Sequence, residues 1–139
     1  MKIDDCIIAR THADFLNDLL EKDYKGWMKS GYKLSDGKTL WMIELGNFVS
    51  PSGWINRLVS QNRLSEKHIY PTFDFQHNTY KNALLNGQYW DCSDRVIFEI
   101  IKDVDCRAYV FRGVFKLNLN ESTTTENIWD LVQDEYDPT

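Results

Sequence analysis

The chain has 139 residues, a formal net charge of −5, 42% hydrophobic residues and 27% charged residues. This ordinary composition excludes a disordered chain, and the length favours a single domain over residues 1–139. No apolar run approaches the roughly 18 residues that a membrane helix needs. The first ten residues, MKIDDCIIAR, fit neither a secretory signal nor a transit peptide, so we expect no membrane partner.

The negative charge is concentrated at the C-terminal end of the chain. All 16 Lys and Arg residues lie within residues 1–116, where they nearly balance the acidic residues, and residues 117–139 carry only acidic charges. A neutral body disfavours strong non-specific binding of nucleic acid, which requires many cations. We expect residues 120–139 to form an acidic helix packed on the body. Such runs usually face solvent, and the alternative is a surface that mimics phosphate.

The cysteines and histidines indicate neither a disulfide framework nor a metal site. Cys6, Cys92 and Cys106 are odd in number, widely spaced and without a CxxC pair, which suits a reducing, cytoplasmic environment. The three histidines are scattered along the chain, whereas zinc usually needs about four converging ligands. We therefore expect structural thiols, no metal and no cofactor.

The first part of the chain predicts a strand, a helix and a hairpin. Residues 3–10 favour a short strand. Thr11 begins a helix whose apolar residues recur at helical spacing, and Gly26 ends it. Asp36 and Gly37 then form a turn signal that joins YKL to TLWMIEL in a hairpin, because glycine tolerates positive φ.

The middle of the chain has weaker patterns. Residues 54–61 fit a short helix, with a strand as the alternative. Residues 67–75 fit a strand that Pro71 interrupts, so this strand is expected at an edge or with a bulge. Residues 77–87 predict a short helix that ends at Gly87.

The last third of the chain predicts a long hairpin and a final helix. Residues 94–103 and 106–119 are rich in β-branched and aromatic residues, which favours two paired strands. Gly113 indicates a bulge or the close approach of another backbone or a ligand. Thr123 and Glu126 have the spacing of a capping box, which predicts a helix after them.

Together these elements predict an α+β domain. Because most strand pairs are joined by tight hairpins, we expect a mainly antiparallel, curved or barrel-like sheet with three to four short helices packed outside it. The segments SDRVIFEI and RAYVFRGVFKL resemble hairpins of the PUA-like group of small barrels, which includes domains that bind modified or flipped bases. This resemblance covers one hairpin, and no functional residue carries over from it.

No motif is specific enough to name a reaction. The nearest template is a metal-dependent nuclease, with Asp74 on one strand and Glu99 followed by Lys102 on another. Their spacing places Glu99 and Lys102 on opposite faces of a strand, so the template fails unless a bulge intervenes. We therefore expect a protein that is not an enzyme, with the nuclease as a minor alternative.

The unusual feature of the composition is its aromatic content of 14%. Most of these rings are expected in the core, but Trp54 and Trp90 lie beside turns and polar residues. A ring at a loop edge stacks on a flat ligand while a nearby polar group hydrogen-bonds its edge. Our first hypothesis is a recognition module that binds a nucleobase, a nucleotide or a nucleic-acid feature in an aromatic-lined pocket. Its expected ligand-binding residues are Trp54, Arg57, Trp90 and Arg112.

The second hypothesis is a small acidic inhibitor protein of the anti-CRISPR or anti-restriction type, such as phages and mobile elements encode. Its contact residues would be Glu126, Asp130 and Asp134 on the expected C-terminal helix. By imitating phosphate, these carboxylates would bind the basic surface of a host nucleic-acid enzyme. The sequence does not define an oligomeric state.

Overall fold

The computed structural model describes residues 1–20, 31–46, 49–50, 53–68, 79–88 and 91–138. The chain divides into two compact units. The first comprises residues 1–44, 95–114 and 132–139, and the second comprises residues 45–94 and 115–131. Within the described ranges, no helix is both long enough and apolar enough to cross a membrane.

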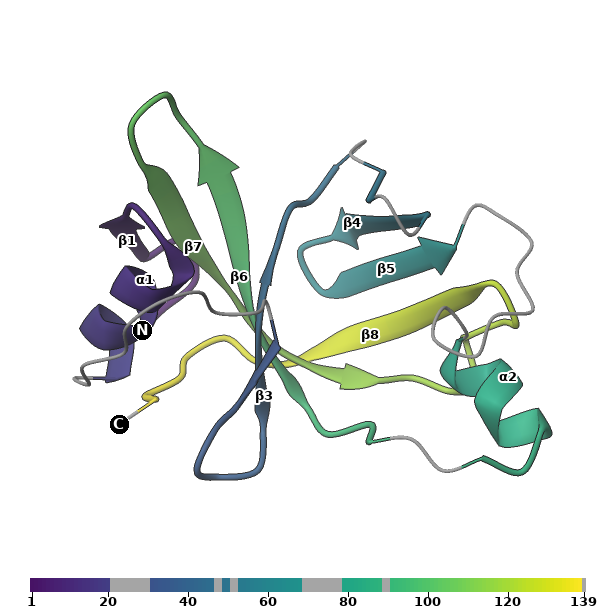
Figure 1. The fold of residues 1–139 in the computed structure, drawn as a ribbon. Helices are drawn as coiled ribbons and strands as arrows, with labels where there is room; N and C mark the ends of the chain where they lie inside the picture. The colour runs from purple at the N-terminus through teal and green to yellow at the C-terminus, as the bar shows by residue number, and fades with distance from the viewer. Residues whose placement is uncertain (21–30, 47–48, 51–52, 69–78, 89–90, 139) are drawn as a thin grey trace. The chain divides into compact units, whose positions relative to one another are not determined.

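Strands dominate the regular structure (Figure 1). The first unit contains β1 (Cys6–Ala9), α1 (His12–Leu20), β2 (Gly31–Lys33), β3 (Thr39–Ile43), β6 (Arg95–Lys102) and most of β7 (Arg107–Leu117). The second unit contains β4 (Trp54–Ser60), β5 (Arg63–His68), α2 (Tyr80–Leu85) and most of β8 (Glu126–Gln133). The expected number of helices is not confirmed, since the described residues form two.

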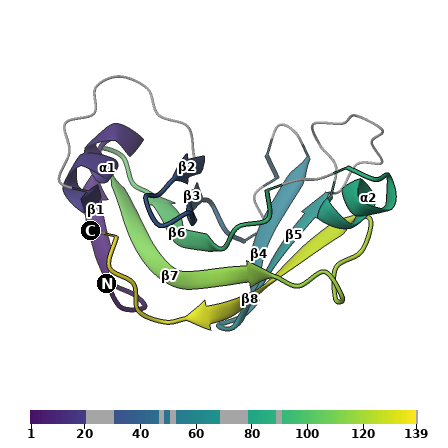
Figure 2. The ribbon, with the colours of Figure 1, turned by 90° about the horizontal axis from the view of Figure 1, so that it is seen from below.

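The strands of the first unit form a mixed arrangement. β2 and β3 make the predicted antiparallel hairpin, with Tyr32 opposite Leu40. β3 then lies parallel to β6, with Leu40 opposite Val96, while β1 runs antiparallel along the first part of β7 (Figure 2). Parallel neighbours need a long connection, which hairpin signals do not reveal. The strand order has two ends, β2 and β4, so the sheet is open and the expected barrel is not confirmed.

Helix α1 packs its apolar stripe into the core of the first unit, as its spacing predicts. Phe15 and Leu16 are fully buried. The ring of Phe15 stacks on Tyr109 at 4.2 Å between centroids and meets Phe98 edge-on at 4.8 Å. Such ring pairs add stability to the fold beyond that expected from the apolar area that they bury. Through these two contacts, Phe15 of α1 packs on both long strands of the hairpin.

The second unit contains a hairpin that replaces the helix expected over residues 54–61. That helix is wrong, and the alternative of a strand is confirmed. The backbone of β4 pairs antiparallel with β5, from Trp54 opposite His68 to Ser60 opposite Arg63. The apolar positions of residues 54–61 fit one face of a helix, and they also fit a strand. Hydrogen bonding to β5 favours the strand over the helix.

The acidic helix expected over residues 120–139 is also wrong. Residues Glu126–Gln133 form β8, which lies antiparallel to β5 with Lys67 opposite Glu126. The spacing that suggested a capping box instead closes a turn, in which the backbone N–H of Thr123 donates to the carbonyl of Glu126 at 2.9 Å. Pairing with a strand about 60 residues away overrides the local helix signal.

The remaining expected elements are confirmed where the structure describes them. β1 lies within residues 3–10, and β6 and β7 form the hairpin predicted over residues 94–119. Helix α2 lies within residues 77–87, and Thr79 caps it by accepting a hydrogen bond from Asn82 N at 3.2 Å. Gly26, the expected end of the first helix, lies outside the described residues. So does Pro71, which was expected to interrupt a strand over residues 67–75.

His12 at the start of α1 occupies a partly buried position beside cations. Its Nδ1 lies 2.8 Å from the hydroxyl oxygen of Tyr109. Burial lowers the pKa of His12 below its ordinary value, and the charges of Arg107 and Lys102 lower it further. The folded protein therefore holds this imidazole neutral under conditions in which the unfolded chain protonates it.

This difference predicts a pH-dependent stability. As the pH falls below about 6.5, the unfolded chain takes up a proton that the folded chain resists, so the free energy of unfolding decreases. Replacing His12 by Gln removes this contribution and flattens the dependence between pH 8 and pH 5. Urea unfolding of both proteins at several pH values measures it. Equal pH dependence in the two proteins would contradict the assignment.

Candidate functional site

A row of polar side chains crosses one face of the three paired strands in the second unit. Asn56 on β4 stands opposite Glu66 on β5, and Glu66 stands opposite Asn127 on β8. Since successive side chains of a strand alternate between faces, these three share one face. We call them the amide–carboxylate row. Trp54 and His68 flank the row on one side, and Leu58, Leu64 and Trp129 flank it on the other.

The Glu66 carboxylate is held in place by side chains of β8. Nδ2 of Asn127 donates to Oε1 of Glu66 at 2.8 Å, and Nε1 of Trp129 donates to the same oxygen at 3.4 Å. Asn127 is only 2% exposed, and its Oδ1 accepts the backbone N–H of Tyr80 at 3.0 Å. The row is therefore tied both to the sheet and to the first turn of α2.

Asn56 differs from the other members of the row. Its Oδ1 is buried and has no hydrogen-bond partner within the part of the chain that the structure describes. Leaving a buried acceptor unpaired costs about 1–3 kcal/mol, and native proteins rarely retain such a group without a reason. A ligand that brings a hydrogen-bond donor would satisfy this oxygen.

Aromatic rings border the row. Trp54 and His68 meet edge to face, with 4.8 Å between ring centroids and an interplanar angle of 79°. His68 is buried, whereas Trp54 is half-buried, and its backbone N–H donates to Oγ of Ser50 at 3.0 Å. The face thus combines hydrogen-bond acceptors with a partly accessible ring, which is the combination that binds the edge and the face of a planar heterocycle.

The structure places the four expected ligand-binding residues in different surroundings. Trp54 lies on the face just described. Arg57 is exposed and, three positions along β4, points to the opposite face of the strand, so the structure does not bring these two together. Trp90 lies outside the described residues.

Arg112 lies in the first unit, where acidic groups of the same chain engage its guanidinium. Nε and Nη2 donate to Oε1 of Glu99 at 2.9 and 2.7 Å, and Nη1 donates to Oδ1 of Asp4. Two carboxylates thus already neutralise the charge that we expected to meet a ligand. Its role in binding stays a prediction.

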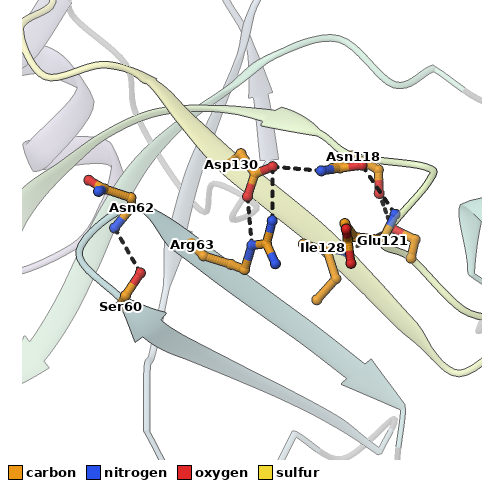
Figure 3. A network of polar contacts seen from close by, with 8 residues as sticks. Ser60, Asn62, Arg63, Asn118, Glu121, Ile128 and Asp130 are labelled. Carbon is orange, nitrogen blue, oxygen red and sulfur yellow. Dashed lines mark hydrogen bonds and ion pairs between the residues drawn. The ribbon is translucent and has the colours of Figure 1, made fainter.

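The acidic residues of the second hypothesis lie on or after a strand instead of on one helical face. Glu126 accepts a hydrogen bond from the hydroxyl of Ser65. Asp130 accepts from Nε of Arg63 at 2.8 Å and from Nδ2 of Asn118 at 2.7 Å, as Figure 3 shows. The hydrogen bond from Arg63 lowers the pKa of Asp130, and the one from Asn118 lowers it further. Asp134 is exposed beyond the end of β8.

The two described residues of the nuclease alternative, Glu99 and Lys102, are each engaged by another side chain. Glu99 bonds to Arg112, Lys102 forms an ion pair with Glu44 at 2.6 Å, and Asp74 lies outside the described residues. Among the described residues, no group of three or more His, Cys, Asp and Glu side chains is placed to hold a metal ion.

Sequence reasoning missed Asn56, Glu66, His68 and Asn127. A signal for two of them is present in RLSEKH, where every second residue, Leu64, Glu66 and His68, belongs to one face of a strand. Polar residues at alternate positions ordinarily indicate the solvent side of a sheet, so the pattern alone does not separate a buried polar row from an exposed one.

The strand-rich sheet is open, and the second unit carries aromatic rings and amides on one face of its paired strands. The sequence matches the SET and RING associated (SRA) domain family over residues 1–137, and the chain belongs to this family. SRA domains bind modified cytosine in DNA, which supports a nucleic-acid recognition module and a DNA partner.

One solved structure illustrates the shared fold. The 5-hydroxymethylcytosine-specific restriction enzyme AbaSI is similar to this chain with a TM-score of 0.63 and 18% sequence identity. The similarity covers 94% of this chain and 40% of that chain, so this protein spans less than half the length of AbaSI. A search of curated proteins finds no match.

The bonds within the row predict a large effect of removing Asn127. Asn127→Ala removes the donor that lies 2.8 Å from Oε1 of Glu66 and the acceptor of the Tyr80 N–H. We expect the free energy of unfolding to fall by about 2–4 kcal/mol, because two hydrogen bonds of a buried side chain are lost together. Urea unfolding measures it, with the exposed Asn120→Ala as the matched control. A loss no larger than that of the control would refute this account of the row.

Proposed function

We propose that this chain is a DNA-recognition module that binds a modified cytosine through the amide–carboxylate row and the flanking ring of Trp54. The observation that carries the proposal is the row itself, in which a half-buried carboxylate lies between two amides on three paired strands. Membership of the SRA family and the printed specificity of AbaSI support the choice of ligand.

The chemistry of the row favours cytosine over uracil-type bases. Cytosine presents an amino group at C4, whereas thymine and uracil present an oxygen there. A carboxylate has about four lone-pair positions and donates nothing, so Glu66 accepts from an amino group in addition to the donors of Asn127 and Trp129. An oxygen at C4 would instead face the carboxylate with no proton between them.

A base inside a duplex does not expose this edge to a sheet. Proteins that bind or modify a single base often extrude it from the stack, then hold it by hydrogen bonds to its Watson–Crick edge and by stacking on aromatic rings. In this proposal Trp54 supplies the stacking surface and Glu66 accepts from the amino group. The proposed function is recognition, and it assigns no catalytic residue.

Duplexes that differ at one base test the proposal. We expect a duplex with one 5-hydroxymethylcytosine to bind about tenfold or more tightly than the unmodified duplex, as one well-read position allows. Fluorescence anisotropy at two salt concentrations measures this. Overall affinity falls with salt because phosphate contacts weaken, while the preference for the modified base persists. Equal affinity for both duplexes would overturn the proposal.

Two variants test the residues involved. Trp54→Ala weakens binding of the modified duplex by about 1–3 kcal/mol, the usual contribution of one stacked base. Glu66→Gln gives the site an amide that donates as well as accepts. The wild type therefore prefers 5-hydroxymethylcytosine over 5-hydroxymethyluracil by about thirtyfold, and the variant loses most of this preference.

The control for Glu66→Gln is Glu135→Gln, which changes the net charge equally at an exposed position in the first unit. It leaves the preference for cytosine unchanged. If both variants change that preference alike, net charge rather than the row determines it, and the assignment of Glu66 is wrong.

A further inference from the structure

We infer that Asn56 determines which 5-substituent of cytosine the site prefers, and that it favours hydroxymethyl over methyl by accepting a hydrogen bond from the substituent's hydroxyl group. The inference rests on the proposed function, and it assigns a specificity role to one residue of the row. Its starting point is the one buried amide oxygen of the row that lacks a partner, Oδ1 of Asn56.

The position of Asn56 beside Glu66 connects it to the 5-substituent. The two residues stand directly opposite each other in the β4–β5 pair, where Cβ atoms lie about 4.5–5.5 Å apart. On a cytosine ring the substituent at C5 is the immediate neighbour of the amino group at C4. When Glu66 accepts from the amino group, a residue next to Glu66 in the row is therefore placed to meet the substituent.

The other neighbour of Glu66 is already committed within the protein. Oδ1 of Asn127 accepts the backbone N–H of Tyr80, and its Nδ2 donates to Glu66. Asn127 thus has both ends of its amide engaged, while the carbonyl end of Asn56 is unpaired. Of the two amides in the row, Asn56 is the one with an acceptor available for a ligand.

The methyl and hydroxymethyl substituents differ in whether they can donate a hydrogen bond to Oδ1 of Asn56. A methyl group offers no hydrogen-bond donor, and placing it against a buried carbonyl leaves the oxygen unpaired. A hydroxymethyl group brings an O–H that satisfies the oxygen. Asn56 as a whole is only half-buried, so a turn about its Cβ–Cγ bond presents Oδ1 to an entering group.

The test compares two duplexes that differ by one hydroxyl group. We expect wild-type protein to bind the 5-hydroxymethylcytosine duplex about tenfold more tightly than the 5-methylcytosine duplex, the contribution of one well-formed hydrogen bond. In Asn56→Leu, which keeps the approximate shape without the amide, this ratio falls to about 1, because only the hydroxymethyl duplex loses affinity. Asn120→Leu, at an exposed site, keeps the wild-type ratio.

A second readout separates a specificity role from a structural one. Because Asn56→Leu removes an unpaired buried acceptor, the thermal midpoint of the free protein stays equal or rises. A marked decrease would mean that the amide is hydrogen-bonded in the free protein, which overturns the inference. If the branched side chain does not fit and prevents folding, Asn56→Ala replaces it in the binding measurement, with the same expected loss of the ratio.

The binding measurements distinguish a failure of the proposed function from a failure of the role assigned to Asn56. If the wild type binds neither modified duplex better than the unmodified one, the proposed function fails and the inference falls with it. If the wild type prefers modified DNA but Asn56→Leu keeps the full hydroxymethyl-to-methyl ratio, only the role of Asn56 is wrong.

Discussion

A half-buried carboxylate needs hydrogen-bond donors, and this requirement organises the second unit. Glu66 receives its donors from the side chains of Asn127 and Trp129, so β8 must lie beside β5 in one register. A slip of one residue would turn both donors to the opposite face and deprive the carboxylate of these two hydrogen bonds. Burial of a charge without partners is strongly unfavourable, so the row and the strand pairing stabilise each other.

The opposite face of the same strands uses its charges differently. Arg63 pairs with Asp130, and Ser65 donates to Glu126, so each bond again joins β5 to β8. Arg63 and Asp130 are partly exposed, and such surface pairs contribute little individually, whereas Ser65 is buried. Their arrangement still explains part of the acidity that the sequence concentrates near its C-terminal end. Two of the carboxylates first proposed as a docking surface hold a strand in place.

What the sequence predicts correctly depends on how local each signal is. The turn at Asp36 and Gly37, the stripe of α1 and the hairpin over residues 94–119 are set by neighbouring residues, and all three are confirmed. β5 and β8 pair across about 60 residues of chain. The sequence predicts a strand only from residue 67 onward, near the end of β5, and the local pattern of β8 fits a helix. The sequence indicates Trp54 as a binding residue because it follows a turn. It does not indicate Glu66 or Asn127, since polar residues in a strand usually face water.

A row rich in acceptors selects mainly by what it disfavours. A donor that meets the half-buried carboxylate of Glu66 replaces bonds to water, so the net gain in affinity there is modest. A ligand that offers an oxygen or a methyl group in the same place leaves a buried acceptor unpaired, and sites built to hydrogen-bond a ligand reject such analogues strongly. The unpaired oxygen of Asn56 weakens the free protein slightly, and the pairing of β4 with β5 keeps this side chain beside Glu66. Strand pairing therefore places an unpaired acceptor where a ligand that brings a donor gains affinity over one that does not.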